Sequence, residues 1–176
     1  LSLSVNPAGG RINRLELRAP ALELTSGEGL LGDNFHHVPE AKFFLTALPY
    51  TASQTGNKLE LRANHRGGGI DFLELSKTIE LAPGETMARV RYRFHNLPAS
   101  MATVEYGFWS QNFMGVPGRE MNCFFPCLNG IQTVPATRAG TPFTYYKKPS
   151  RGWLGYALLE GGGLAVTMDY ALLDQI

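Results

Sequence analysis

The residues best suited to chemistry or binding lie in one aromatic and amide-rich stretch, residues 105–125. Its first part alternates, with Phe108 and Trp109 on opposite sides of an extended chain, which is the period of a strand with one buried face. The side chains suited to holding a ligand here are Phe108, Trp109, Gln111, Asn112 and Arg119. An aromatic plate beside amides and a guanidinium suits a sugar, because apolar sugar faces stack on rings while amides bind hydroxyl groups. The alternative is a core strand whose Trp109 covers the hydrophobic interior.

Other candidate ligand-binding residues come from loops. Residues 25–41 form the longest irregular stretch, and long loops in compact domains are often functional. From this loop, from the Gly-rich loop after residue 63 and from the loop before residue 153 we take Asn34, His36, His37, His65 and Trp153. The alternative for the histidine pair is a solvated loop tip. Adjacent histidines on an extended chain point in opposite directions, so they do not readily share a metal.

Three further motifs do not predict a cofactor or metal. The Gly27–Gly32 segment reads G-x-G-x-x-G, but dinucleotide binding requires a following helix, and the next residues have no helical apolar period and end at Pro39. Asp33 with Asn34 offers too few oxygen ligands for a calcium site. The C-x3-C pair at positions 123 and 127 is interpreted first as two buried free thiols, with a disulfide as the alternative and a zinc site as a weaker one.

Composition limits the class of protein. The chain has 176 residues, 44% hydrophobic and 18% charged, which excludes disorder and predicts a single domain, residues 1–176, with a real core. A net charge of +1 indicates neither nucleic acid nor an anionic membrane as a partner, and no apolar run is long enough to span a bilayer. Both ends interrupt apolar runs, so we expect a piece of a longer parent protein whose other domains are its partners.

The apolar pattern predicts an all-β fold. Short alternating segments follow one another with turn signals every eight to twelve residues, and no convincing long helix is present, which is typical of an antiparallel β-sandwich. A bulge is expected near Asn13 or Arg14, where the alternation of Ile12 with Leu15 goes out of phase. The cleanest strand carries Arg89, Arg91 and Arg93 on one face, which is interpreted as a solvated sheet face rather than a site for an anionic polymer. The other predicted strands include residues 1–5, 22–24, 43–47, 59–63, 70–81, 131–134, 142–146, 153–159 and 164–168.

The order of these segments resembles the galactose mutarotase-like β-supersandwich, the fold of aldose 1-epimerases and of accessory domains in many glycoside hydrolases. The matching segments, within about residues 1–130, are Gly9–Ile12 with Leu15 and Leu17, Lys77–Leu81, Val90–Phe94 leading to Asn96, and Tyr106–Phe113. The resemblance implies a supersandwich and a carbohydrate partner. Mutarotases place a histidine acid at the end of a core strand, and here Ser110, Gln111 and Asn112 stand at that place. Asn64-His65 with Gly68-Gly69 resembles another family segment.

Three functions remain open. The first is a non-catalytic carbohydrate-binding module or accessory domain of a polysaccharide-active protein, without cofactor, secreted, periplasmic or on the cell surface. The second is a sugar epimerase or lyase that uses His65 or His36 with one of three glutamates, although an amide at the expected acid position cannot transfer protons. Those glutamates are Glu105, Glu120 and Glu160. The third is a structural or assembly domain, since aromatic and arginine residues are also enriched at protein interfaces.

Overall fold

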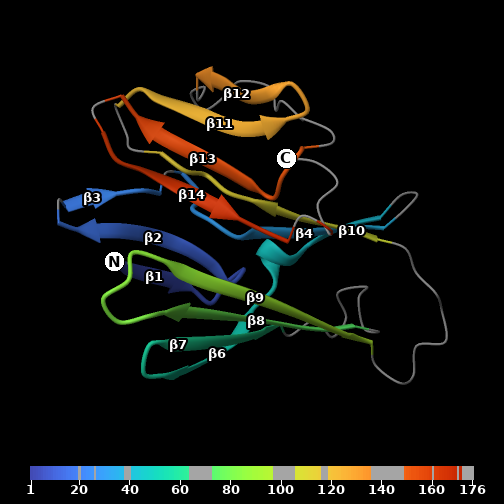
Figure 1. The fold of residues 1–176 in the computed structure, drawn as a ribbon. Coiled ribbons are helices and arrows are strands. Elements are labelled where there is room, and N and C mark those ends of the chain that lie inside the picture. Colours follow the sequence, from blue (N-terminus) through green and yellow to red (C-terminus); the bar gives the residue numbers. More distant parts are fainter. Residues whose placement is uncertain are drawn as a thin grey trace. The chain divides into compact units, whose positions relative to one another are not determined.

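The chain is all-β, and every pair of strands is antiparallel, as the alternation predicts (Figure 1). This computed structural model describes residues 1–19, 21–25, 27–37, 41–63, 73–96, 106–115, 119–135, 149–159, 161–169 and 171. Its contacts divide the chain into two compact units, Leu1–Phe113 and Met114–Ile176. That the whole chain forms one domain stays a prediction. Among the described residues, no helix is long and apolar enough to cross a membrane.

The described part of the first unit contains three sheets. Their strands are β1 (Ser2–Asn6), β2 (Arg11–Arg18), β3 (Ala21–Glu23), β4 (Gly32–His37), β5 (Ala41–Phe44), β6 (Tyr50–Thr55), β7 (Lys58–Ala63), β8 (Leu73–Leu81), β9 (Ala88–Asn96) and β10 (Tyr106–Gln111). They pair in the orders β1-β2-β3, β10-β4-β5 and β6-β7-β8-β9. The expected bulge is confirmed, because Ser4 pairs with Arg14 and Val5 with Ile12, which leaves Asn13 as the extra residue.

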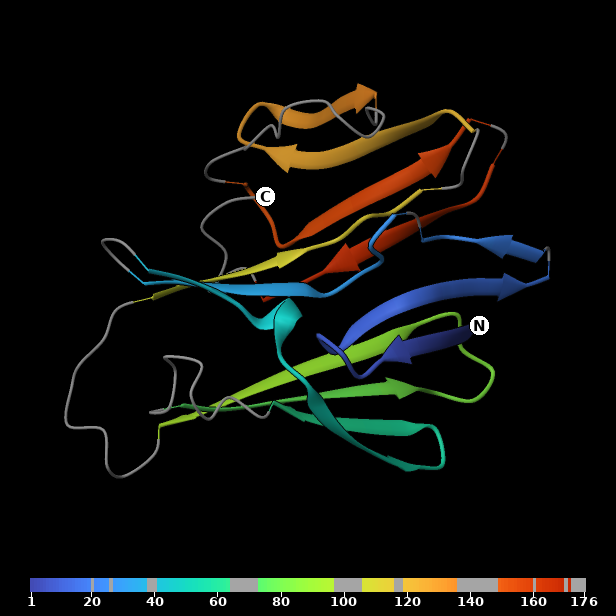
Figure 2. The same ribbon diagram turned by 180° about the vertical axis from the view of Figure 1, so that it is seen from behind.

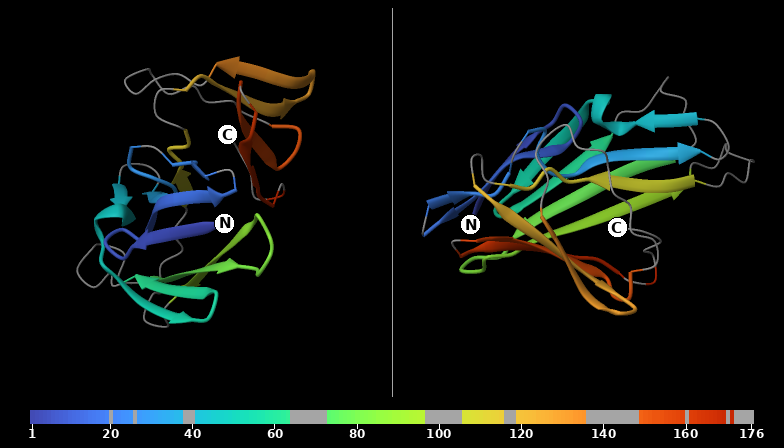
Figure 3. Two further views of the ribbon diagram at one scale, coloured as in Figure 1. Left: turned by 90° about the vertical axis from the view of Figure 1, so that its left-hand side faces the viewer. Right: turned by 90° about the horizontal axis from the view of Figure 1, so that it is seen from above.

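Two of these sheets pack face to face within the first unit, and this is the sandwich-like part of the fold. Phe108 on β10 touches the rings of Tyr92 and Phe94 on β9, with ring centroids 4.9 and 5.1 Å apart. The ribbon shows β4 and β10 lying over β8 and β9 (Figure 1 and Figure 3). The core that fills this unit is apolar and almost fully buried, and it includes Ile12, Leu15, Leu24, Leu30, Leu45, Leu61, Leu75 and Ile79.

The described residues of the second unit form one four-stranded sheet with two unlike faces, seen from both sides in Figure 1 and Figure 2. Its strands are β11 (Met121–Cys127), β12 (Gly130–Pro135), β13 (Trp153–Leu158) and β14 (Gly163–Thr167), in the order β12-β11-β13-β14. Because successive side chains on a strand point to opposite faces, Phe125 and Leu158, which are buried, mark the more buried face. The other face carries Trp153 and the exposed residues Ala165 and Thr167.

Several predicted boundaries are wrong. Residues 25–41 are not one irregular loop, because β4 and β5 form a hairpin there. Residues 43–47 are not one strand, since the chain leaves β5 into a 3-10 turn at Leu45–Ala47. β6 was missed because its residues after Tyr50 are exposed on both faces and, apart from Ala52, polar, so they show no apolar alternation. The absence of a helix after Gly27–Gly32 is confirmed, because β4 follows directly. The strand predicted over residues 142–146 lies outside the described residues.

Candidate functional site

The predicted platform at the end of β10 is described only in part. The backbones of Trp109 and Gln111 lie in β10, paired with Asn34 and Gly32, but their side chains are outside the described part of the structure. Phe108 contacts the rings of Tyr92 and Phe94 on β9, of which Phe94 is 44% exposed. Arg119 comes after the end of β10 in the chain and lies on an exposed segment just before β11.

The two described carboxamides of the predicted site bind backbone. Asn112 accepts a hydrogen bond from the Leu31 N–H at 3.0 Å through Oδ1, and its Nδ2 donates to the Ser110 carbonyl at 3.1 Å. Asn34 is only 5% exposed, and its Nδ2 donates to the Gly32 carbonyl at 3.3 Å. Of these bonds, the one between Leu31 and Asn112 holds the turn into β4 against the end of β10. The carboxamide of Asn112 is therefore directed at main chain instead of at a sugar hydroxyl group.

The Asn112 bond is one of several that secure the segment before β4. The Phe113 N–H donates to the Gly29 carbonyl at 2.8 Å. Ile12 and Leu30 exchange both of their backbone hydrogen bonds, at 3.0 and 2.8 Å. Residues 29–31 are thus bound on one side by β2 and on the other by the residues that follow β10.

Two of the three candidate histidines lie on β4. His36 and His37 belong to β4, where they pair with Gly107 and Tyr106 of β10, but only their backbone is described. The loop that contains His65 lies outside the described residues. Among the residues whose side chains the structure describes, no group of three or more His, Cys, Asp or Glu is arranged to hold a metal ion.

The cysteines are two free thiols, half-buried in β11. Cys123 and Cys127 share a face of one regular strand, so their Cα atoms are separated by about 13 Å at the usual rise per residue. A disulfide needs Cα atoms within about 7 Å, and Pro126 does not bend the strand enough to bring them together, because it keeps its pairing with Ile131. The side chain of Cys123 hydrogen-bonds to Tyr156, and burial raises the pKa of its thiol despite that bond.

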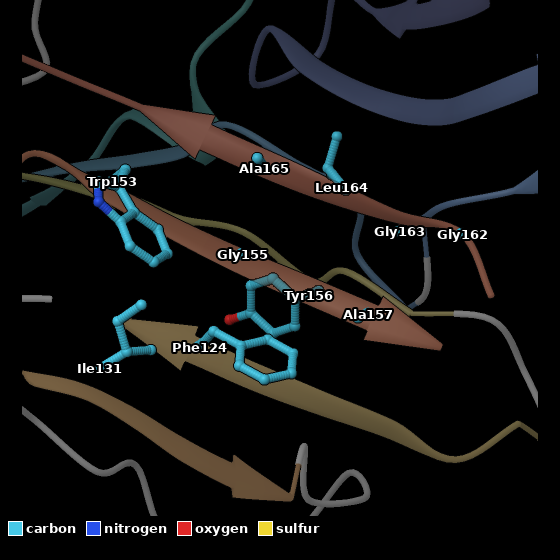
Figure 4. Close-up of a pocket in the computed structure, with 10 residues that line it drawn as sticks. All are labelled: Phe124, Ile131, Trp153, Gly155, Tyr156, Ala157, Gly162, Gly163, Leu164 and Ala165. Atoms are coloured by element: carbon cyan, nitrogen blue, oxygen red, sulfur yellow. The ribbon is translucent and has the colours of Figure 1, made fainter. Parts of the chain in front are cut away.

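Trp153, by contrast, lines a hollow on the more exposed face of the second unit (Figure 4). The hollow is a shallow, open groove of about 460 Å³. The side chains that share this face of the sheet and line the groove are Phe124, Ile131, Trp153, Ala157 and Ala165, with Gly155 between them. The groove is mostly apolar, and its lining residues carry no charge.

The register explains the shape of the groove. Phe124, Gly155 and Ala165 form one row across three strands, because Phe124 pairs with Gly155 and Gly155 with Ala165. Trp153 stands two residues before Gly155, in the neighbouring row, so the indole rises beside positions with little or no side chain. As a result, Gly155 and Ala165 form a flat floor beside the aromatic rings of Trp153 and Phe124. Polar neighbours stand directly across the strands, Thr167 opposite Trp153 and Thr133 opposite Phe124.

A second cluster, which the sequence did not indicate, lies inside the first unit. Lys77 on β8 donates a hydrogen bond to Oδ2 of Asp33 on β4 at 2.7 Å, and neither side chain is exposed. The Tyr92 hydroxyl donates to Oδ1 of the same carboxylate at 3.0 Å. The Lys77 ammonium also lies over the rings of Tyr50 and Tyr92, 5.1 and 5.8 Å from their centroids. We call these four residues the buried polar cluster.

Burial dominates the electrostatics of this cluster. Desolvation raises the pKa of Asp33 above its ordinary value, against the lowering effect of the Lys77 charge and hydrogen bonds. Desolvation likewise lowers the pKa of Lys77, against the Asp33 charge. Both shifts favour the uncharged forms of the pair. Lys77 lies on the same buried face of β8 as Leu75 and Ile79. A charged residue at a position where the alternation predicts a buried apolar one is the sequence signal from which the cluster could have been inferred.

Comparison with known proteins adds no relative: no family model, no curated protein and no solved structure matches this chain.

Proposed function

We propose that this chain is a non-catalytic carbohydrate-binding module or accessory domain of a polysaccharide-active protein, and that it binds its ligand in the groove beside Trp153. One observation carries the proposal. An indole and a phenyl ring flank a floor of glycine and alanine on the more exposed face of an open sheet. A pyranose ring presents apolar C–H faces, and such faces stack on aromatic side chains while the small floor residues leave room for the sugar.

Polar groups at the edges of the groove support the same ligand. Thr133 and Thr167 are exposed and stand beside the two aromatic residues, and Asn122 pairs with Ala157 on the same face. Hydroxyl and carboxamide groups both donate and accept hydrogen bonds, which matches the hydroxyl groups of a sugar. An open groove without charged lining residues also favours a neutral, extended glycan over a phosphorylated or acidic one.

The enzymatic alternative has less support. Sugar epimerisation and lyase chemistry both require a proton donor and a proton acceptor on a common substrate. Among the groove-lining residues that the structure describes, only Tyr156 carries a titratable group, and burial raises the pKa of that phenol further above neutrality. The groove therefore offers binding without acid–base chemistry.

The finer parts of the proposal come from the sequence alone. The mutarotase-like supersandwich, the membership of a larger parent protein and the location outside the cytoplasm stay predictions. The platform that the sequence predicts at Trp109 and Gln111 is the competing location for the same ligand.

Affinity electrophoresis against soluble polysaccharides, followed by calorimetry with derived oligosaccharides, tests the proposal. We expect at least one neutral polysaccharide to retard the chain and Trp153→Ala to remove the retardation. Leu128→Ala is the matched control, because Leu128 is 85% exposed in the same unit and does not line the groove. Loss of binding in Trp109→Ala with retention in Trp153→Ala would move the site to β10. Absence of binding to every neutral glycan would refute the proposal.

A structural or assembly function is the second candidate, and a specific observation favours it. Three large apolar residues of the second unit are strongly exposed, Leu128 at 85%, Ile131 at 62% and Leu159 at 63%. Exposed apolar surface of this kind often marks a protein interface. Sedimentation velocity over a range of concentrations separates this function from sugar binding. A self-associating chain that becomes monomeric in Leu128→Asp would support assembly.

A further inference from the structure

The buried polar cluster places a potential nucleophile beside a potential electrophile. Nζ of Lys77 lies 2.7 Å from Oδ2 of Asp33, and both side chains are 0% exposed. The two residues come from β4 and β8, strands of two different sheets, and are 44 positions apart in the chain. Gly10 closes the space beside the lysine, since a Cβ at that position would stand 2.7 Å from Lys77 Cε. The amine is therefore held against the carboxyl group by packing.

The surroundings of the pair are aromatic and dry. The ring of Tyr50, a residue only 6% exposed, and the ring of Tyr92 flank the Lys77 ammonium. In such an environment the charged forms of both partners lose hydration, which raises the pKa of Asp33 and lowers that of Lys77. Transfer of one proton from Nζ to Oδ2 then gives a neutral amine facing a neutral carboxylic acid.

We propose that Asp33 and Lys77 join in an intramolecular amide bond, which links β4 covalently to β8. The inference rests on the contact between the two side chains, on their complete burial and on the hydrogen bond from Tyr92. It is independent of the proposed carbohydrate function, which concerns the second unit.

The reaction is a condensation that needs no other reactant. Nζ of the neutral lysine attacks the carboxyl carbon of Asp33 and forms the C–N bond. Tyr92 donates its hydrogen bond to Oδ1, the oxygen on which negative charge develops, and so acts as an oxyanion donor. The C–Oδ2 bond breaks, and Oδ2 leaves as water with its own proton and one proton from Nζ. Fixed proximity replaces activation by an external group.

Intact-mass spectrometry of the purified, denatured chain tests the proposal directly. We expect the wild-type mass to be lower than the calculated mass by one water, and a protease digest to contain one branched peptide that joins Asp33 to Lys77. Lys77→Met removes the amine and should restore the calculated mass. Lys58→Met is the matched control, because Lys58 is exposed at the start of β7, and this variant should keep the loss of water.

The wild-type measurement decides the question even where a variant does not fold. A wild-type chain at its full calculated mass, with a native circular-dichroism spectrum, would overturn the proposal and leave the pair as an ion pair only. A loss of water that maps to residues other than Asp33 and Lys77 would overturn it as well. Tyr92→Phe adds a kinetic readout, since removal of the oxyanion donor should leave a slowly decreasing fraction of chains at full mass.

Discussion

Asp33 and Lys77 form a fully buried contact of 2.7 Å between two facing sheets of the first unit. Burying an acidic and a basic side chain in the interior costs solvation free energy, and only close partners offset that cost. Asp33 meets this condition with two donors in addition to the cross-strand neighbour Ser110, whose side chain also hydrogen-bonds to it. The stability of the first unit should therefore depend strongly on Asp33 and Lys77.

Replacement of Lys77 by methionine should lower the free energy of unfolding by about 3–5 kcal/mol, because it leaves the Asp33 carboxyl buried without its main partner. Urea unfolding followed by circular dichroism measures the change. Lys58→Met, at an exposed position, should change stability by less than about 0.5 kcal/mol. Equal effects of the two variants would contradict the structural role of the cluster.

The two tyrosines of the cluster should respond differently to loss of their hydroxyl groups. Tyr92→Phe removes the donor to Asp33 Oδ1 and should cost about 1–3 kcal/mol, because it leaves a buried acceptor without its hydrogen-bond donor. The Tyr50 hydroxyl is buried and has no hydrogen-bond partner among the described residues. Tyr50→Phe should therefore be neutral or stabilising by up to about 1 kcal/mol. Paired denaturation curves test the contrast, and a larger loss in Tyr50→Phe than in Tyr92→Phe would reverse it.

Stability should decrease in alkali. Burial, and then the Asp33 charge, raise the pKa of both Tyr50 and Tyr92 above the ordinary value of 10.0. A group with a raised pKa in the folded state contributes its full stability below the unfolded pKa, and this contribution is lost as pH rises from there through the folded pKa. The wild type should therefore lose stability above about pH 10 more steeply than Tyr50→Phe does. Urea midpoints across this pH range, together with the phenolate absorbance of the folded protein, provide the measurement. If the midpoints of the wild type and of Tyr50→Phe fall in parallel as pH rises, the prediction is wrong.

Gly29 should be intolerant of a side chain. Its φ is +82°, and a Cβ there would collide with the carbonyl oxygen of Ile12 in the paired backbone. Gly29→Ala combines this clash with left-handed strain and should cost more than about 2 kcal/mol. Gly56→Ala is the control for backbone strain alone, because Gly56 has φ +58° and no atom lies within 4 Å of its Cβ position. This variant should cost about 1–2 kcal/mol. Thermal unfolding of both variants measures the two losses of stability. An equal loss in Gly29→Ala and Gly56→Ala would show that the contact with Ile12 adds nothing to the backbone strain.

Much of the fold could be predicted because alternation reports directly on a sheet with one buried face. The bulge at Asn13 and the strand around Val90 and Tyr92 follow from that pattern alone. β6 could not be found, since its exposed polar residues have no period. Boundaries in residues 25–41 were also wrong, because a β4–β5 hairpin rich in polar residues resembles a loop.

The candidate site was predicted less well, for a physical reason. Sequence reasoning selects aromatic and amide residues that lie close together in the chain, as Trp109 and Asn112 do. A groove depends on which small residues stand beside the aromatic ones, and Gly155 and Ala165 reach Trp153 only through the register of β13 and β14. Asp33 and Lys77 are likewise neighbours only across two sheets. Trp153 can be chosen as a candidate ligand-binding residue because it is a tryptophan, whereas the residues around it are known only from the structure.

The double attachment of residues 29–31 has a consequence for biosynthesis. Ile12 holds this segment from one side, and Asn112 and Phe113 hold it from the other. The last partners are synthesised more than eighty residues after the segment that they bind. Such long-range closure slows folding, so the emerging polypeptide should stay incompletely folded on the ribosome until Phe113 has left the exit tunnel. Chaperones would have their main opportunity to act during that interval.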